Sequence, residues 1–432
     1  MSTDTAPTHV GGRGGEQRIG QRELLTLISA LMALMALGID LMLPAFDDIR
    51  VAFDLGEASP RTGQVITVFF LGLAVSQLVY GPLADRFGRK PILYVGIGIY
   101  LVGAVGSALA PTFELLLLSR FVWGVGAAGA RVVATAIVRD RFEGGAMAKA
   151  MSQIMAVFML VPVLAPTLGT GIIAILPWRG VFWFCVVWAI VIGLWSLRLR
   201  ETLDPAHRRP LRFGPMWNGY AEVTRTPVTF GYTIATVFLQ GVFTTYLASS
   251  ELLISDVFGR RAQFPFIFGL VAVLFGLGAL INGRIVVRLG VHRLVNRVYA
   301  ILIPLVTLSV VVSVSAGGTP NFWLFMPLLG LTLASFMFLM PNLNTAALEP
   351  VGHLAGTASA LSGAARMGGG AVLGTIVSAQ VSDSTTPFSI GVAVLCLGSW
   401  LSVLVVRRRS PRLAVDHLTS ATPTSPTGAV IG

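Results

Sequence analysis

Long apolar stretches separated by short polar segments run through most of the sequence. A helix needs roughly 20 apolar residues to cross the ~30 Å hydrocarbon core of a bilayer. Since 54% of the 432 residues are hydrophobic and only 12% are charged, a water-soluble fold is excluded. The sequence instead predicts an all-α membrane protein with twelve transmembrane helices, at residues 24–46, 62–82, 91–110, 114–137, 149–173, 178–197, 229–253, 264–286, 296–315, 321–345, 355–381 and 386–406.

The 31 lysine and arginine residues are distributed unevenly about these stretches. On the side of the N-terminus lie 23 of them, while five lie on the opposite side and three within stretches. Because cytoplasmic loops carry the excess of Lys and Arg, we expect both termini in the cytoplasm of a bacterial inner membrane. The net charge of +11 then reflects topology and not nucleic-acid binding. No small-residue cleavage pattern follows the first stretch, so we expect it to be retained.

The longest polar interruption, residues 198–228, divides the stretches into two groups of six. We therefore expect cytoplasmic tails at 1–23 and 407–432, six-helix bundles at 24–197 and 229–406, and a cytoplasmic linker at 198–228. Apolar residues at helical spacing predict a short amphipathic helix in the linker; they are Phe213, Met216, Trp217 and Tyr220. Gly81, Arg86 and Gly88 recur at the same spacing as Gly283, Arg288 and Gly290, which indicates the internal duplication common in secondary transporters.

Several motifs resemble those of one family. The loop Gly81-Pro82-Leu83-Ala84-Asp85-Arg86-Phe87-Gly88-Arg89-Lys90-Pro91 resembles the loop between spans 2 and 3 of the major facilitator superfamily. Leu118-Ser119-Arg120 with Gly124, Gly126 and Gly129, and Val138-Arg139-Asp140, resemble span 4 of its proton-driven drug exporters. Gly38-Ile39-Asp40-Leu41-Met42-Leu43-Pro44-Ala45, Ala358-Ser359-Ala360, Pro341-Asn342 and Leu348-Glu349-Pro350 resemble its Bcr/CflA-type drug resistance branch. The resemblance implies a major facilitator fold of two six-helix bundles that exchanges drugs for protons.

The chain departs from the pattern of these exporters at three places. The span 5 motif, expected to read Gly-Pro-x-x-Gly-Gly, keeps only Pro166 and Gly169. Arg366 stands where an uncharged polar residue is expected, and Glu251 stands where related sequences tend to carry proline.

Asp40 is a carboxylate within an apolar stretch, which costs about 2.5–3.5 kcal/mol on insertion scales. Its position matches the membrane-embedded acid of related drug exporters, so we expect a proton site; a structural carboxylate is the alternative. Arg120 lies at a similar depth and is expected to hold Asp40 charged, or else to brace helices through backbone carbonyls. Glu251, near the outer end of its stretch, either reaches water or serves as a second titrating or cation-recognising group.

Polar residues in other stretches are candidates for lining a substrate cavity, although each can equally join two helices by a hydrogen bond. They are Gln77, Tyr80, Gln240, Tyr246, Asn342 and Asn344. Arg131 either lines the inner part of this cavity or reaches the cytoplasm, and Arg366 either contacts substrate or packs in the gate.

Two further groups of residues are expected to take part in conformational change. Asp85 is expected to accept hydrogen bonds from Arg139 and to face the N-terminus of the eleventh span, forming a latch that closes the cytoplasmic side. The residues of this latch are Gly81, Asp85, Arg86, Gly88, Arg89 and Arg139. In span 5, Pro162, Pro166 and Gly169 suit a seam between rocking bundles, or simple core packing.

We interpret the chain as a monomeric transporter that exports small lipophilic compounds in exchange for protons. It is not expected to be an enzyme or to bind a metal, since its five histidines fall in or near loops and tails without metal-ligand spacing. It needs no cofactor, because the proton gradient supplies the energy. The alternatives are an exporter of a native sugar, amino acid or peptide, and a membrane receptor that transports nothing.

Overall fold

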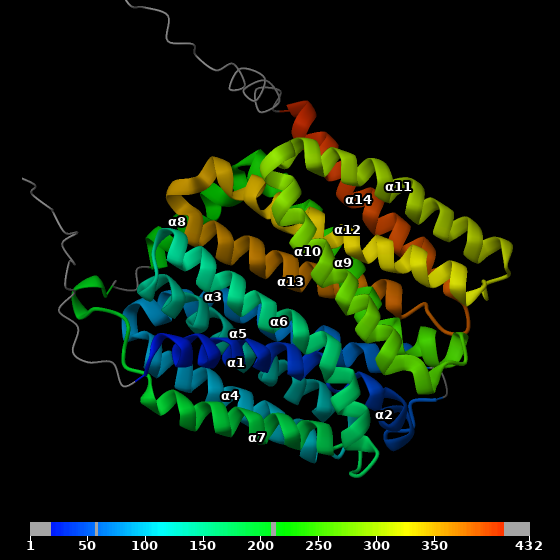
Figure 1. Cartoon of the computed structure of the whole chain (residues 1–432), viewed down its shortest axis with the longest axis horizontal. Coiled ribbons are helices and arrows are strands. Elements are labelled where there is room, and N and C mark those ends of the chain that lie inside the picture. Colours follow the sequence, from blue (N-terminus) through cyan, green and yellow to red (C-terminus); the bar gives the residue numbers. More distant parts are fainter. Residues whose placement is uncertain (1–18, 57–58, 209–212, 410–432) are drawn as a thin grey trace, which may run out of the picture.

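The computed structural model describes residues 19–56, 59–208 and 213–409, in which the regular elements are all helical (Figure 1). Most of the two predicted tails lies outside the described residues. Eleven segments of the described chain are long and apolar enough to cross a membrane. One of them, Phe322–Ser378, holds two helices joined by a short 3-10 segment, so the twelve predicted spans are confirmed.

The elements before the linker occupy the lower part of Figure 1. They are α1 (Gln21–Asp40), η1 (Leu43–Ala45), α2 (Phe46–Ala52), η2 (Pro60–Gly63), α3 (Gln64–Phe87), α4 (Arg89–Leu109), α5 (Phe113–Arg141), α6 (Gly144–Ile173) and α7 (Gly180–Trp195). In this first half α5 packs against α1, α3 and α4, and α7 packs against α1 and α4.

The elements after the linker occupy the upper part of Figure 1. They are α9 (Pro227–Leu252), the π-helical η5 (Leu253–Val257), η6 (Arg261–Gln263), α10 (Phe264–Leu289), α11 (Val291–Ser315), α12 (Phe322–Leu348), η7 (Glu349–Leu354), α13 (Ala355–Ser378) and α14 (Thr385–Arg409). In this second half α9 packs against α12, α13 and α14. The two halves meet through α3 with α13 and α6 with α10.

The molecule has two ends along its helices. We call the end where α1 begins and α14 ends the terminal end, and the opposite one, where α2 lies, the α2 end (Figure 1). Close to the α2 end, Thr67 of α3 and Thr375 of α13 join the halves with their hydroxyl oxygens 2.5 Å apart.

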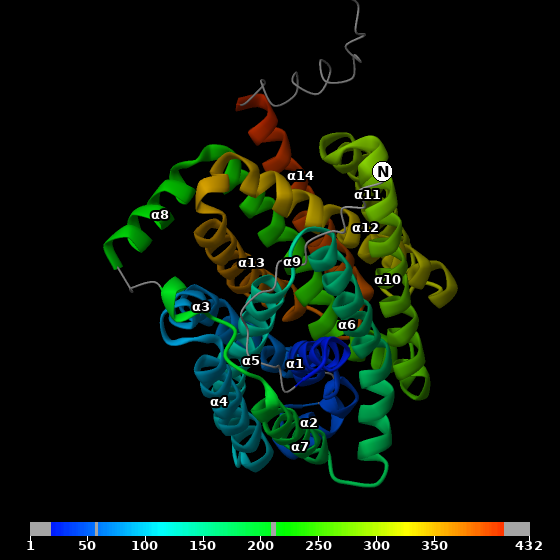
Figure 2. The same ribbon diagram turned by 60° about the vertical axis from the view of Figure 1, so that its left-hand side comes forward.

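The linker contains α8 (Phe213–Arg225), the amphipathic helix expected there, which lies outside both sets of helices in Figure 2. Trp217 on this helix is 74% exposed, as expected for an apolar side chain that rests on lipid. The Tyr220 hydroxyl donates to the Leu78 carbonyl of α3 at 3.3 Å. Burial raises the pKa of Tyr220. The hydrogen bond fastens the linker helix to the first half.

The first predicted span is not one continuous helix, because α1 ends at Asp40. Pro44 has no backbone N–H to donate to the carbonyl four residues earlier, which is that of Asp40. The chain turns through Leu41 and Met42 and resumes as η1 and α2. Asp40 therefore lies at a helix break and not within a regular helix.

Candidate functional site

Asp40 is buried at this break, with only 5% of its surface exposed. It forms no hydrogen bond or ion pair with any residue in the described part of the chain. Across the boundary between the halves it interacts electrostatically with Tyr246 of α9, whose buried hydroxyl also lacks a hydrogen-bond partner. A carboxyl group and a phenol without partners thus lie near each other where the two halves meet.

Arg120 does not form the expected ion pair with Asp40. Its Nη2 donates to the Gly38 carbonyl at 2.7 Å and its Nε to the Val65 carbonyl at 3.4 Å. The guanidinium also lies 4.6 Å from the ring centroids of both Phe69 and Trp123. The helix end at Asp40 leaves carbonyl groups without helical partners, and Arg120 satisfies one of them. Of the two interpretations of Arg120, the contacts match the brace through backbone carbonyls.

Gly169 in the span 5 motif packs directly on the same break. A Cβ atom at this position would lie 2.2 Å from the Leu41 carbonyl oxygen, so only glycine lets α6 come this close. Pro166 of the motif is buried, whereas Pro162 is half-buried one turn earlier on α6. The shortened motif therefore keeps the residue that contacts α1 beside Asp40.

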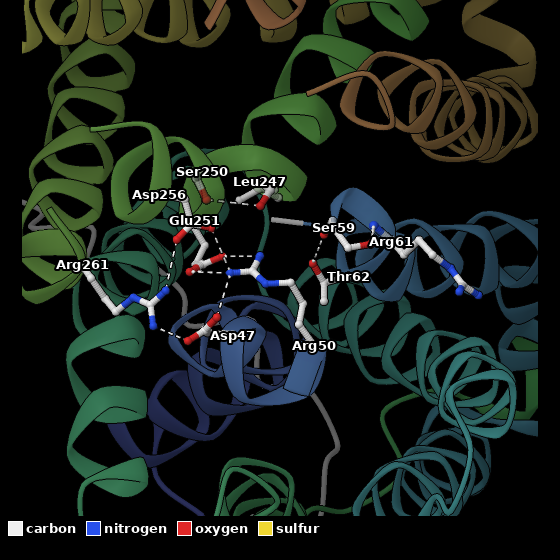
Figure 3. Close-up of polar contacts among 10 residues, drawn as sticks. All are labelled: Asp47, Arg50, Ser59, Arg61, Thr62, Leu247, Ser250, Glu251, Asp256 and Arg261. Atoms are coloured by element: carbon white, nitrogen blue, oxygen red, sulfur yellow. Dashed lines mark hydrogen bonds and ion pairs between the residues drawn. The ribbon is translucent and has the colours of Figure 1, made fainter. Parts of the chain in front are cut away.

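A cluster of charged residues joins the two halves at the α2 end (Figure 3). Arg50 of α2 lies 3.0 Å from Glu251 of α9, 3.2 Å from Asp256 of η5 and 3.3 Å from Asp47 on its own helix. Arg261 of η6 completes the cluster through ion pairs with Asp47 and Asp256. A cavity of about 250 Å³ lies beside it, with Asp47, Glu251 and Arg261 in its wall. We call these five residues the α2-end cluster.

Glu251 does not reach water as expected. Its side chain is 4% exposed and that of Arg50 is 3% exposed. The Arg50 Nη1 and Glu251 Oε2 atoms are paired by charge but are not aligned as a hydrogen bond, whereas Nη2 donates to Oε1 at 3.3 Å. Removing one partner of a buried pair leaves a buried charge uncompensated. The pair therefore fastens the halves to each other at this end.

The loop predicted as a latch is also arranged differently from the expectation. Asp85 accepts from Arg89 at 2.5 Å, and Arg89 Nε donates to Asp140 at 2.8 Å. Glu201 accepts from the backbone N–H groups of Arg89 and Lys90 at 2.8 and 3.1 Å, which satisfies free donors at the N-terminus of α4. These contacts join α3, α4, α5 and the segment after α7, all within the first half.

The expected bond from Arg139 to Asp85 is not formed. Arg139 is exposed, and its side chain contacts no acidic group among the described residues. Arg89, four residues after Asp85, reaches the carboxylate in its place because the chain turns sharply at Gly88, where φ is +103°. A side chain at Gly88 would also meet Glu201, with its Cβ 2.5 Å from Oε2. Arg86 is exposed over the Phe87 ring, and Gly81 has open space around it.

The remaining polar candidates fall into two groups. Asn342 donates to Asn282 at 2.7 Å and so joins α12 to α10, while Asn344 is exposed and Gln240 is buried against Gly370 of α13. Gln77, Tyr80 and Arg131 each have a buried polar atom without a partner, and Arg366 interacts electrostatically with Arg131. The second group therefore contains buried polar atoms that have no hydrogen-bond partner among the described residues. No group of three or more His, Cys, Asp or Glu side chains in the described chain could hold a metal ion.

Sequence reasoning missed Arg50, Asp47, Asp256, Arg261 and Glu201 as functional residues. The first four of these belong to the α2-end cluster and lie in predicted loops, where charges are ordinary, and the partners that connect the two halves are about 200 residues away in sequence. One indication of this cluster was present in the sequence, namely that Glu251 stands where related sequences tend to carry proline. Glu201 follows no spacing rule that would connect it to Arg89.

Comparisons with known proteins agree with this architecture. The sequence profile of the Major Facilitator Superfamily matches residues 26–375. A bicyclomycin resistance protein homolog of Haemophilus influenzae is 28% identical over 380 residues, covering 86% of this chain and 93% of that protein. The multidrug resistance protein MdtL of Salmonella typhi is 29% identical over 389 residues, covering 89% and 95%. An uncharacterized MFS-type transporter of Bacillus subtilis, YdgK, is 29% identical over 387 residues, covering 86% and 90%.

Solved structures share the fold at low sequence identity. A D-xylose-proton symporter superposes with a TM-score of 0.70 at 13% identity, covering 88% of this chain and 97% of that one. A bacterial homolog of the human lysosomal transporter Spinster superposes with a TM-score of 0.66 at 14% identity, covering 94% and 100%. The chain has twelve membrane helices in two halves and carries the α3–α4 loop described above, and the family profile matches most of its length. Together these observations assign the chain to a family. The chain is a multi-pass membrane transporter of the major facilitator superfamily, and not an enzyme.

Proposed function

We propose that this transporter exports small lipophilic or drug-like compounds across the bacterial inner membrane in exchange for protons. The observation that carries the proposal is Asp40, a buried carboxyl group that has no ion pair with any described residue and lies at a helix break between the halves. A carboxyl group in such a place binds a proton when its surroundings are dry and releases it when they are wet. Relatives named for bicyclomycin and multidrug resistance support a drug-like substrate.

The positive-inside rule supports an orientation with the terminal end in the cytoplasm and the α2 end outside. In that orientation the α2-end cluster closes the outer side of the structure. Exchange then requires the cluster to open, so that Asp40 takes up a proton from outside and substrate leaves. Closure of the outer side returns Asp40 toward the cytoplasm, where it releases the proton before the next substrate binds.

Arg120 has a positioning role in this scheme. It holds the carbonyl at the end of α1 while stacking on two aromatic rings. Since an arginine keeps its proton in proteins, its positive charge stays near the break throughout the cycle and favours the return of Asp40 to the charged form.

The test is drug and proton flux in everted vesicles with an imposed pH gradient, over a panel of antibiotics and dyes. We expect wild type to exchange protons for drug, and Asp40→Asn to bind drug without exchange. Asp383→Asn, which changes an exposed carboxylate in a loop, serves as the matched control and is expected to exchange normally. Unchanged coupling in Asp40→Asn would reject Asp40 as the carrier. Absence of flux for every panel compound would favour export of a native metabolite, or a receptor that transports nothing.

A further inference from the structure

Two arginines of the interior, one from each half, interact electrostatically with each other and with no acidic group in the described chain. Arg131 of α5 belongs to the first half and Arg366 of α13 to the second, and both side chains are half-buried. Arg131 is the one charged group with which Arg366 interacts among the described residues, and Arg131 itself meets no acidic group there. Its buried Nη1 atom has no hydrogen-bond partner. Two buried positive charges therefore act on each other without a compensating negative charge in the described chain.

Polar groups of α3 pack against the two helices that carry the arginines, close to each arginine in sequence. The Gln77 amide oxygen sits against Gly363, three residues before Arg366 on the same helix, at 2.4 Å from where a Cβ would be. The Tyr80 ring packs against Gly129, two residues before Arg131. The Gln77 oxygen and the Tyr80 hydroxyl are buried and unpaired. Tyr80 can donate one hydrogen bond and the Gln77 amide nitrogen two more.

The chemistry of this arrangement suits an anion. Like charges away from bulk water repel each other strongly, so the pair favours any ligand that brings a negative charge between them. Guanidinium groups bind carboxylate, phosphate and sulfonate oxygens through paired N–H donors. We propose that Arg131 and Arg366 together bind an anionic group of the transported compound, with Gln77 and Tyr80 as further hydrogen-bonding partners. This inference rests on the proposed function, because it names the class of compound that the same transporter would export.

The position of the pair links binding to movement. Since one arginine comes from each half, their repulsion opposes any approach of α5 toward α13. A bound anion removes this repulsion and attracts both halves. The compound exported is therefore a lipophilic anion, whose charge allows the halves to close around it.

Binding of two xanthene dyes to purified protein in nanodiscs, measured by fluorescence polarisation without a proton gradient, tests the inference. Carboxyfluorescein is anionic and rhodamine 6G is cationic, while their ring systems are alike. We expect wild type to prefer carboxyfluorescein, and Arg366→Gln and Arg131→Gln each to weaken its binding about ten- to hundredfold. Rhodamine 6G should bind these variants as well as or better than wild type. Arg366→Lys, which keeps the charge but not the paired N–H donors, should recover part of the affinity.

A second measurement needs no ligand. Arg366→Gln removes the repulsion, so the ligand-free variant is expected to melt at a higher temperature than wild type, and added carboxyfluorescein should raise the melting temperature of wild type only. Arg284→Gln, at an exposed position on α10, is the matched control and should change neither result. Equal loss of both dyes, preference for rhodamine 6G, or a lower melting temperature of ligand-free Arg366→Gln would overturn the inference. Dye binding does not require proton coupling, so these outcomes are independent of the Asp40→Asn test.

Discussion

Gly169 shows how a single residue fixes the surroundings of Asp40. Its missing side chain leaves α6 in contact with the Leu41 carbonyl, and overpacking of a closely packed site costs about 1–3 kcal/mol. We expect Gly169→Ala to lower the melting temperature of the detergent-solubilised protein by several degrees and to reduce transport. Gly171→Ala on the same helix meets nothing within 4 Å and is the matched control. Equal melting temperatures for the two variants would show that the contact with α1 does not matter.

Arg120 is another residue whose contacts make a definite prediction. Lysine has the same charge but cannot donate to two carbonyls while stacking on two rings. Arg120→Lys is therefore expected to destabilise the protein by about 1.5–3 kcal/mol, as judged by thermal unfolding. Arg179→Lys, at a less buried arginine that donates to Ala110 and lies over Trp178, should cost less. Full stability of Arg120→Lys would mean that charge alone is required.

A functional residue could be predicted from the sequence where placing its side chain in an apolar environment costs much free energy. Asp40 stands out in the sequence because an unpaired carboxylate in lipid needs a reason, and the structure leaves it without an ion pair among the described residues. Its partner was not predictable in the same way. Depth along a helix places Asp40 and Arg120 at one level, but the helix break directs Arg120 to the Gly38 carbonyl.

The helix α2 and the end of α9 are joined by a buried ion pair, which closes the α2 end of the molecule. Removing one partner of the buried pair Arg50 and Glu251 is expected to cost about 3–5 kcal/mol, while removing both should cost less than the sum. We predict that Arg50→Gln and Glu251→Gln each expose the α2 end, measured as faster labelling of a cysteine placed at Thr67. The exposed pair Arg61 and Glu114, 4.0 Å apart, offers Glu114→Gln as control, with an expected cost of about 0–1 kcal/mol. Additive costs for the two buried changes would argue against a coupled closure.

Elements were predicted more completely than their interruptions and contacts. The helices and the amphipathic segment in the linker follow from apolar length and periodicity. The break after Asp40 was missed because the apolar run continues unchanged through Pro44. The partner of Asp85 was predicted wrongly because the turn at Gly88 brings Arg89, only four residues later in the sequence, against the Asp85 carboxylate. The prediction instead relied on Arg139, which is distant in sequence.

The whole molecule moves, in the proposed function, by rocking one half against the other, and this requires Thr67 and Thr375 to separate. Their hydroxyl oxygens are 2.5 Å apart, so cysteines at both positions are close enough to cross-link. In a background lacking the buried Cys185 and Cys396, we expect the Thr67→Cys and Thr375→Cys double variant to lose transport on oxidation and regain it on reduction. Each single variant is the control. Undiminished transport by the cross-linked protein would exclude rocking at this seam.

The duplication suspected from the sequence is also visible at this scale. Gly88 and Gly290 occupy equivalent places, each preceding a helix with a positive φ of +103° and +73°. The first turn joins α3 to α4 and the second joins α10 to α11, so each connects the second membrane span of its half to the third. The sequence showed the repeat because glycine is the residue that adopts this conformation at little cost. It did not show which residues of the two halves meet, since such contacts join segments far apart in the chain.

The unpaired arginines Arg131 and Arg366 also bear on what can drive transport. A cycle that moves one monovalent anion outward and one proton inward carries two positive charges into the cell. Each charge is worth about 2.3 kcal/mol per 100 mV of membrane potential, so this cycle gains about 4.6 kcal/mol per 100 mV. That energy corresponds to roughly three decades of concentration ratio. Such a transporter would generate an electrical current and would continue to expel its substrate with voltage alone, in a cell whose inside and outside have the same pH.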